Sequence, residues 1–184
     1  MTHLVDYSGE FEPEFSHDTF INETLFALLK FYATYLKFVD GIWYSMVSGR
    51  WGSKEALERD IGMLKRARAY EAAALSSLLN IRGDDVATVM KLTQLSPWVQ
   101  TLEFEIDLKD NDHAIYTVRA CPTLAILEKE GKGNDTTICL DACMMSGRVT
   151  AHYCNPKIEI TPLKLAPREG KDDICCRWEF KLDR

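Results

Sequence analysis

The chain has 184 residues, of which 46% are hydrophobic, and a formal net charge of -6. A chain of this length buries one sizeable core, so we expect one domain. The acidic balance argues against nucleic acid as a partner, because proteins that track phosphates gather Lys and Arg on one face. No stretch approaches the roughly 18 uninterrupted apolar residues of a membrane span, and the first residues do not resemble a secretory signal. We therefore expect a soluble, cytoplasmic protein without a membrane partner.

The first half of the chain predicts helices. Residues 1–17 are rich in glutamate around Pro13 and are expected to form an extended arm. Beyond the arm, apolar residues recur in alternating steps of four and three, which predicts the seam of a long packed helix: Ile21, Leu25, Leu28, Tyr32, Tyr35, Val39, Ile42 and Met46. Good helix formers continue over 53–79, so the two segments should form a helical hairpin. A shorter helix is expected from residue 84 or 85 to residue 95.

In the second half, the hydrophobic period changes from 3.6 to 2. Apolar and acidic residues alternate over 102–108, so 101–120 should form a β-hairpin with one solvent-facing side. Helices are expected over 123–131 and 136–154, and strands over 157–165 and 174–182. The predicted fold class is α+β: an N-terminal long helical hairpin packed on a C-terminal four-stranded antiparallel sheet with two covering helices.

The predicted domain organisation follows from this order. Residues 1–17 form the arm, and residues 18–184 form a single α+β domain. Within that domain, 18–96 is helical and 97–184 is a ββααββ part that contains all six cysteines. Cysteines that only fill a core should not segregate in this way, although a single chain can do so by chance. Without a secretory signal we expect free thiols or metal thiolates rather than disulfides.

The spacing of the cysteines predicts which of them can lie close together. Cys139 and Cys143 are four residues apart and share one helix face. In the last strand, Cys176 shares its face with two aromatic residues and should point inward, which leaves Cys175 on the solvent side. The expected inner set contains Cys121 from a strand end, Cys139 from a helix and Cys176 from the last strand. Its fourth member comes from the same helix as Cys139 and is either Cys143 or Asp141.

Zinc is the metal that we expect for such a set, because thiolates are among its preferred ligands. Cys139 should lie in the first turn of its helix, where the helix dipole favours a thiolate, either as a ligand or as a nucleophile. The alternative is that the cysteines pack in the core, since the chain contains no C-x2-C pair of the zinc-finger kind.

Asp40 is the candidate acid or base. It flanks the apolar seam of the first helix and precedes Gly41, which costs a helix about 1 kcal/mol. We expect Asp40 to line a pocket between the hairpin and the sheet, with Trp43 and Tyr44 as the walls that bind a substrate. Asp141 is the second candidate for proton transfer. The alternative places Asp40 at the edge of the stripe, paired with a surface Lys or Arg.

Several short motifs resemble a known group. They are CP at 121–122, CLD at 139–141, NPKIEI at 155–160, CRWEF at 176–180 and VDGIWYSMV at 39–47. These motifs look like a prokaryotic family of domains of unknown function, similar to the L-2-amino-thiazoline-4-carboxylate hydrolase-like proteins and, more distantly, to vinyl-reductase-like ligand-binding domains. The resemblance covers most of the chain from about residue 20. It implies a cysteine-bearing site for a small molecule or a metal, and hydrolysis of a cyclic C-N or C-S compound as one activity.

Three functions are consistent with these patterns. The first is an enzyme, a hydrolase acting on a C-N bond, in which a zinc ion bound by cysteines assists the reaction and Asp40 or Asp141 transfers protons. The second is a non-catalytic module that senses a ligand or a metal. The third is an interaction protein in which the heptad-like seam of the first helix forms a homodimer.

Overall fold

The structure is a computed structural model that describes residues 4–131, 133, 135–170 and 172–184. Its helices are the 3-10 turn His17–Thr19, α1 (Asn22–Trp51), α2 (Ser53–Leu78), α3 (Val86–Leu95), α4 (Pro122–Glu130), α5 (Asp135–Ile138), the π-helical turn Cys139–Cys143, and α6 (Met144–Cys154). Its strands are β1 (Glu103–Asp110), β2 (His113–Ala120), β3 (Glu159–Lys164) and β4 (Cys176–Lys181). Within this described part, no helix is long and apolar enough to cross a membrane.

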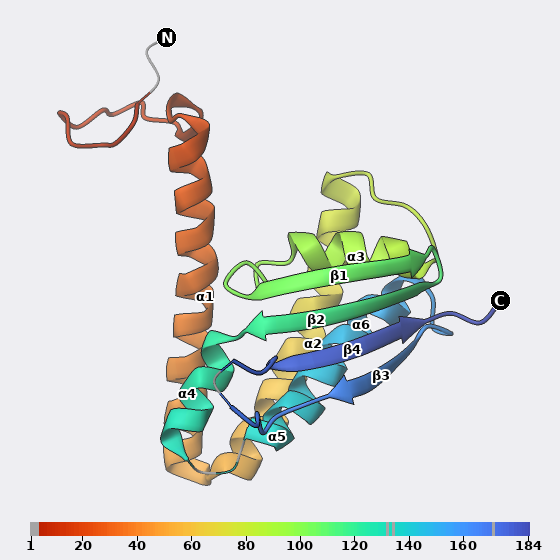
Figure 1. The fold of residues 1–184 in the computed structure, drawn as a ribbon. Helices are drawn as coiled ribbons and strands as arrows, with labels where there is room; N and C mark the ends of the chain where they lie inside the picture. Colours follow the sequence, from red (N-terminus) through yellow and green to blue (C-terminus); the bar gives the residue numbers. More distant parts are fainter. Residues whose placement is uncertain (1–3, 132, 134, 171) are drawn as a thin grey trace.

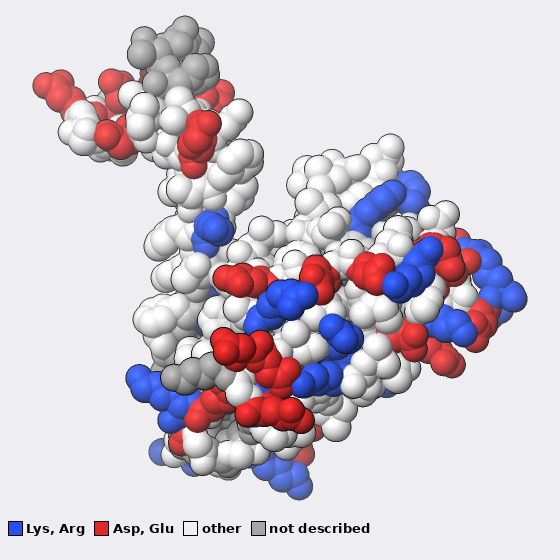
Figure 2. Space-filling view, viewed as in Figure 1, with Lys and Arg blue, Asp and Glu red and all other residues white. Residues whose placement is uncertain are grey.

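The four strands form one antiparallel sheet in the order β1-β2-β4-β3. Helices α2, α3 and α6 lie behind the sheet in Figure 1, and the other face is turned toward the viewer. That open face is dotted with charges of both signs in Figure 2, among them the ion pair between Arg119 and Glu105 at 2.9 Å. The α+β class and the helical hairpin predicted from the sequence are therefore confirmed.

Local chemistry explains where the elements begin. The carboxylate of Asp85 accepts a hydrogen bond from the backbone N-H of Thr88 at 2.8 Å and caps α3. Cys121 caps α4 in the same way, since its Sγ accepts from the N-H of Leu124 at 3.4 Å. Between α1 and α2 the chain reverses at Gly52, whose φ of 90° lies in the region that favours glycine. Gly52 therefore allows the sharp turn that joins the two helices of the hairpin.

The hydrophobic core lies between the sheet and the helices behind it. Trp178 and Phe180 point inward from β4, with Tyr116 from β2, and they pack with residues of α3 and α6. Helix α6 approaches closely because Gly147 has no side chain: a Cβ there would lie 3.2 Å from Cδ1 of Ile160 and 3.6 Å from Cζ of Phe180. The inward aromatic face predicted for the last strand is confirmed.

Helix α1 has the opposite orientation to the one that its seam predicts. The five seam residues from Tyr32 onward are 45–71% exposed: Tyr32, Tyr35, Val39, Ile42 and Met46. The residues that pack toward the domain lie on another stripe, which includes the buried Ala33 and Val47. In Figures 1 and 2, α1 rises beside the sheet as a mostly uncharged column. The expectation that this seam packs inside the molecule is wrong.

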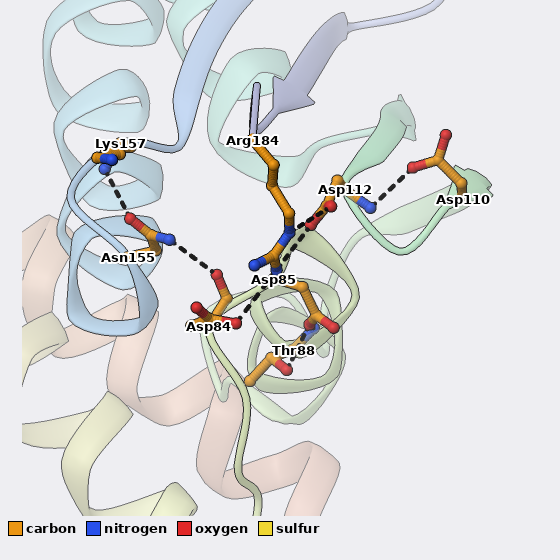
Figure 3. Close-up of polar contacts among 8 residues, drawn as sticks. All are labelled: Asp84, Asp85, Thr88, Asp110, Asp112, Asn155, Lys157 and Arg184. Atoms are coloured by element: carbon orange, nitrogen blue, oxygen red, sulfur yellow. Dashed lines mark hydrogen bonds and ion pairs between the residues drawn. The ribbon is translucent and has the colours of Figure 1, made fainter.

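A polar network joins the C-terminal residue Arg184 to the β1-β2 turn and to the segment before α3 (Figure 3). The guanidinium of Arg184 donates to Asp112 at 2.6 Å, beside the β1-β2 turn, and to Asp84 at 3.1 Å, just before α3. Asn155, at the end of α6, donates from Nδ2 to the carbonyl oxygen of Asp84 at 3.1 Å. A shallow hollow of about 270 Å³ lies among these groups, and the contacts account for its polar lining.

Candidate cysteine site

A π-helical turn interrupts the helix that contains Cys139 and Cys143. The turn spans Cys139–Cys143 and separates α5 from α6. Such turns are rare and occur often at functional sites. Because the helix begins at residue 135, Cys139 follows the first turn instead of lying within it. The expected help of the helix N-terminus to a Cys139 thiolate is therefore wrong, since the dipole effect falls off within the first turn.

Cys139 and Cys143 form a hydrogen-bonded thiol pair. This hydrogen bond is the largest cause that raises the pKa of Cys143 well above its usual value, followed by burial and then by the negative charges that Cys139, Cys176 and Cys121 would carry. Cys139 is buried, whereas Cys143 has surface open to solvent. Cys143 is therefore the most exposed of the four predicted cysteines, and its raised pKa keeps it a neutral thiol near pH 7.

Cys176 and Cys121 approach the same pair from the sheet. Cys176 pairs with Val118 of β2, and Cys121 lies one residue beyond the end of that strand. Burial raises the pKa of Cys176 to about 12, a hydrogen bond with Trp178 acts in the opposite direction, and the charges of Cys139 and Cys121 raise it further. The structure thus brings the four expected thiols within electrostatic range of one another. We call Cys121, Cys139, Cys143 and Cys176 the thiol cluster.

The two other cysteines have partners outside the cluster, although Cys175 also interacts electrostatically with Cys121 and Cys176. Cys175 is 2% exposed, and its Sγ donates to the carbonyl oxygen of Arg119 at 3.3 Å. The expectation that Cys175 faces solvent is wrong, because β4 begins only at Cys176 and the strand alternation does not extend back to Cys175. For Cys154, burial raises the pKa to about 11, with a further contribution from Asp85 on the α3 side of the core.

The thiols are not arranged in the geometry of a metal site. Among the residues that the structure describes, no group of three or more His, Cys, Asp or Glu side chains is arranged to hold a metal ion. The donor set itself suits a thiophilic ion, because four sulfurs are the usual ligands of closed zinc sites.

A pair of carboxyl groups lies beside the cluster. Asp40 of α1 and Asp60 of α2 share a hydrogen bond, and burial raises the pKa of both. The pKa of Asp60 reaches about 7, because the charge of Asp40 adds to the effect of burial. Two carboxylates this close favour a state with one shared proton. The neighbours of Asp40 are Asp60 and the half-buried Lys37, whose charge acts against the effect of burial, so a lysine partner for Asp40 remains one interpretation.

Lys37 connects the carboxyl pair to the thiols. Burial lowers the pKa of its ammonium group, and the charges of Cys121, Cys143 and Asp40 act in the opposite direction. Lys37 and Asp40 lie three residues apart on α1, so they share the inward face of that helix. The thiol cluster and the carboxyl pair therefore belong to one region.

Unpaired polar atoms gather in the same region. The described residues include five buried side-chain atoms without a hydrogen-bond partner, and four of them are Oδ1 of Asp40, Oδ1 of Asp60, Nε of Arg68 and the hydroxyl oxygen of Tyr116. The pKa of Tyr116 is raised by burial and then by Cys176, Cys143 and Cys121, so its ring lies near the cluster. Buried polar groups without partners are uncommon and suggest an unseen water, ion or ligand.

The other predicted site residues occupy different surroundings. Tyr44 is half-buried, and burial raises its pKa, followed by the charges of Asp60 and Glu130. Trp43 instead lines an open groove of about 610 Å³ on α1 and α2, together with Arg59 and Arg66. Asp141 is exposed within the π-helical turn. Tyr44 thus lies with the carboxyl pair, whereas Trp43 faces a separate groove.

Sequence reasoning missed Asp60, Lys37, Tyr116 and Arg68. The signal for two of them lies in α2, where the buried residues recur every four positions and include Asp60 and Arg68. The basic run at 65–68 predicts a solvated face, but Arg68 is 5% exposed. Its guanidinium donates to Glu71 at 2.6 Å and to Thr150 at 3.1 Å. The sequence feature that indicates this site is therefore a charged residue on the buried face of α2.

Comparisons with known proteins give a family and no activity. The model of a family of unknown function, DUF6125, matches residues 18–182. No curated protein and no solved structure matches the chain. The likeness to thiazoline hydrolase-like proteins therefore rests on the short motifs alone, and chemistry must be argued from the site.

Proposed function

The chain belongs to the DUF6125 family, whose description names no activity, and we propose that it binds a small molecule at a centre built on zinc and the thiol cluster. One observation carries the proposal: four thiols from a strand end, a π-helical turn and a central strand lie close enough that ionising one would raise the pKa of another. Chance packing gives no reason for such convergence from separate elements.

The electrostatics support a divalent cation. A hydrogen bond with Cys139 and burial raise the pKa of Cys143, burial raises that of Cys176, and repulsion between neighbouring thiolates adds to both shifts. A doubly charged cation removes this repulsion, and its binding releases the thiol protons. Zinc is the proposed ion because its closed sites use sulfur ligands at about 2.3 Å.

The small molecule would bind between the cluster and the carboxyl pair. Lys37 offers a positive charge, Asp40 and Asp60 offer unpaired acceptor oxygens, and the hydroxyl group of Tyr116 lacks a partner. These groups suit a compact polar ligand that has both an acidic group and N-H donors. Cys143 is the most exposed residue of the thiol cluster.

The metal part of this proposal is tested by zinc analysis of the full chain, purified without oxygen. We expect one zinc ion per chain in the wild type. Cys176→Ser should bind zinc at least 10-fold more weakly. The matched control is Cys154→Ser, because Cys154 is half-buried but its pKa responds to Asp85 and not to the cluster. Absence of zinc from the wild type, or equal zinc affinity in both variants, would overturn the proposal.

A second candidate is hydrolysis of a C-N bond in a small ring compound, and the pKa of Asp60 favours it. A carboxyl with a pKa of about 7 can act as a base and as an acid near neutral pH. In such a reaction the carboxylate takes one proton from water while the oxygen adds to the C=N carbon, and it passes that proton to the ring nitrogen. As the carbonyl group forms and the ring C-N or C-S bond breaks, the remaining hydroxyl proton passes through the same carboxyl group to the leaving N or S atom. Asp40 would hold the shared proton in place.

The alternative to hydrolysis is a non-catalytic ligand- or metal-sensing module, and one assay separates the two. L-2-amino-thiazoline-4-carboxylate is the probe, because the sequence motifs resemble proteins named for its hydrolysis. Turnover by the wild type and by Asp107→Asn, an exposed control, but not by Asp60→Asn, would support the enzyme. Binding of the probe without turnover contradicts the hydrolase candidate and favours the sensing module.

A further inference from the structure

The outward face of α1 is apolar over most of its length. Its large exposed side chains, 37–71% accessible, are Phe26, Leu29, Phe31, Tyr32, Tyr35, Leu36, Phe38, Val39, Ile42, Trp43 and Met46. At 100° per residue, those from Leu29 to Met46 fall within one half of the helix circumference. Lys37 and Asp40 lie on the other half, toward the thiol cluster. One half of α1 therefore faces the thiol cluster, and the other half faces solvent.

The exposed area is large enough for a stable interface. A fully exposed aromatic or large aliphatic side chain presents roughly 200 Å². With the fractions above and without Phe26, which lies on the other half of the helix, the outward face offers roughly 1,000 Å² from these side chains. A specific interface needs about 800 Å² from each partner. An apolar patch of this size on a monomer is unusual and marks a site of interaction.

The spacing of the residues points to another helix as the partner. The exposed seam alternates in steps of three and four from Tyr32 to Met46, which is the a and d pattern of a coiled coil. The positions beside the seam, which include Phe31, Phe38 and Leu36, are apolar instead of charged. A partner must therefore cover a broad face, and a face identical to this one meets that need through two-fold symmetry.

We propose that the outward face of α1 is the interface of a homodimer, in which the second copy packs its own α1 against the same residues. A membrane surface fits less well, because lipid-binding helices carry Lys and Arg along the rim of the apolar face. Here Lys30 lies well away from the outward face, and Arg50 is the one basic residue of α1 within that half of the helix. Figure 2 shows the column of α1 with few charges on the visible side.

Dimerisation would also steady the candidate site. Lys37, Asp40 and Tyr44 reach the site from a helix whose upper part projects beside the sheet (Figure 1). A partner on the outward face fixes the position of the helix and thus of these three side chains. The dimer does not depend on zinc, so the two proposals can fail separately.

Sedimentation velocity on the full chain tests the dimer. The wild type should sediment at twice the chain mass of 21.0 kDa at micromolar concentration. The double variant Tyr35→Lys/Ile42→Lys should be monomeric, with its dissociation constant raised at least about 100-fold and its zinc content unchanged. Tyr70→Lys, at an exposed aromatic position of α2, is the matched control and should remain dimeric.

Three results would overturn the dimer: a monomeric wild type, a dimer that survives the double variant, or a monomer that binds lipid vesicles through α1. If the double variant does not fold, hydrogen exchange of the wild type across a dilution series gives the answer. Protection of amides 29–46 should fall on dilution, while protection of the sheet stays constant. Equal protection of amides 29–46 at all concentrations contradicts the proposal.

Discussion

Replacing Asp60 by asparagine should make the protein more stable above neutral pH. In the wild type, burial and the charge of Asp40 raise the pKa of Asp60 from 3.8 to about 7. The folded protein therefore keeps a proton on this carboxyl between about pH 4 and pH 7, where the unfolded chain has lost it. The stability that this proton linkage contributes is full below pH 4 and is lost as pH rises through 7. Asparagine does not titrate, so this loss disappears.

The size of the effect follows from the shift. A difference of about three pKa units corresponds to about 4 kcal/mol at 1.36 kcal/mol per unit, which is an upper value because the shared hydrogen bond changes as well. We expect Asp60→Asn to exceed the wild type by about 2–4 kcal/mol at pH 8. For a domain of this size, Tm should rise by roughly 5–15 °C. At pH 4 the two proteins should differ much less.

Urea unfolding at pH 4, 6 and 8 measures this directly, with Asp107→Asn as the control. Asp107 lies on the exposed β1 strand, and its side chain is 57% accessible, so its variant should follow the wild-type profile. Parallel pH profiles for Asp60→Asn and the wild type would refute the shared-proton pair. Loss of stability at pH 8 in Asp60→Asn would show that Asp60 is instead held as a stabilising carboxylate.

Three further variants test the packing around the site by urea unfolding at pH 7. Arg68→Ala should cost about 3–5 kcal/mol, because it removes the buried cation that pairs with the half-buried Glu71 and the donor to Ser96 and Thr150; a cost below about 1 kcal/mol would mean that these contacts are not made. Gly147→Leu should cost about 1–3 kcal/mol through overpacking against Ile160 and Phe180, and a neutral result would show that α6 lies farther from the sheet. Arg184→Ala should have no measurable effect, since its ion pairs are solvent-exposed; a clear loss of stability would show that the C-terminal network supports the fold.

Much of the fold could be predicted because local patterns decide it. The change of period near residue 101 marks the start of the sheet, and Asp85 caps α3 near the place that the sequence indicates. The alternation in β4 puts Trp178 and Phe180 inside. These features depend on the backbone periods of helices and strands, which sequence shows directly.

Prediction from the sequence failed where contacts between distant parts of the chain determine the structure. The apolar seam of α1 predicts which residues want to be buried, but not whether they meet this chain or a second copy. The π-helical turn adds a residue to one helical turn, which no spacing rule anticipates, and the earlier start of α5 at residue 135 leaves Cys139 beyond the first turn. Asp60 gains its importance from Asp40, twenty residues earlier, so neither position shows the pair alone. Strand and helix geometry correctly placed Cys139 inside, but it did not anticipate that Cys175 is buried and that Cys143 is exposed.

The most direct test of the central claim is an anomalous scattering map at the zinc edge, from crystals of the full chain grown with zinc. The thiol cluster predicts one strong peak per chain, surrounded by the Sγ atoms of Cys121, Cys139, Cys143 and Cys176 at about 2.3 Å. A map with no peak there, with the four sulfur atoms pointing into separate apolar surroundings, would contradict the account.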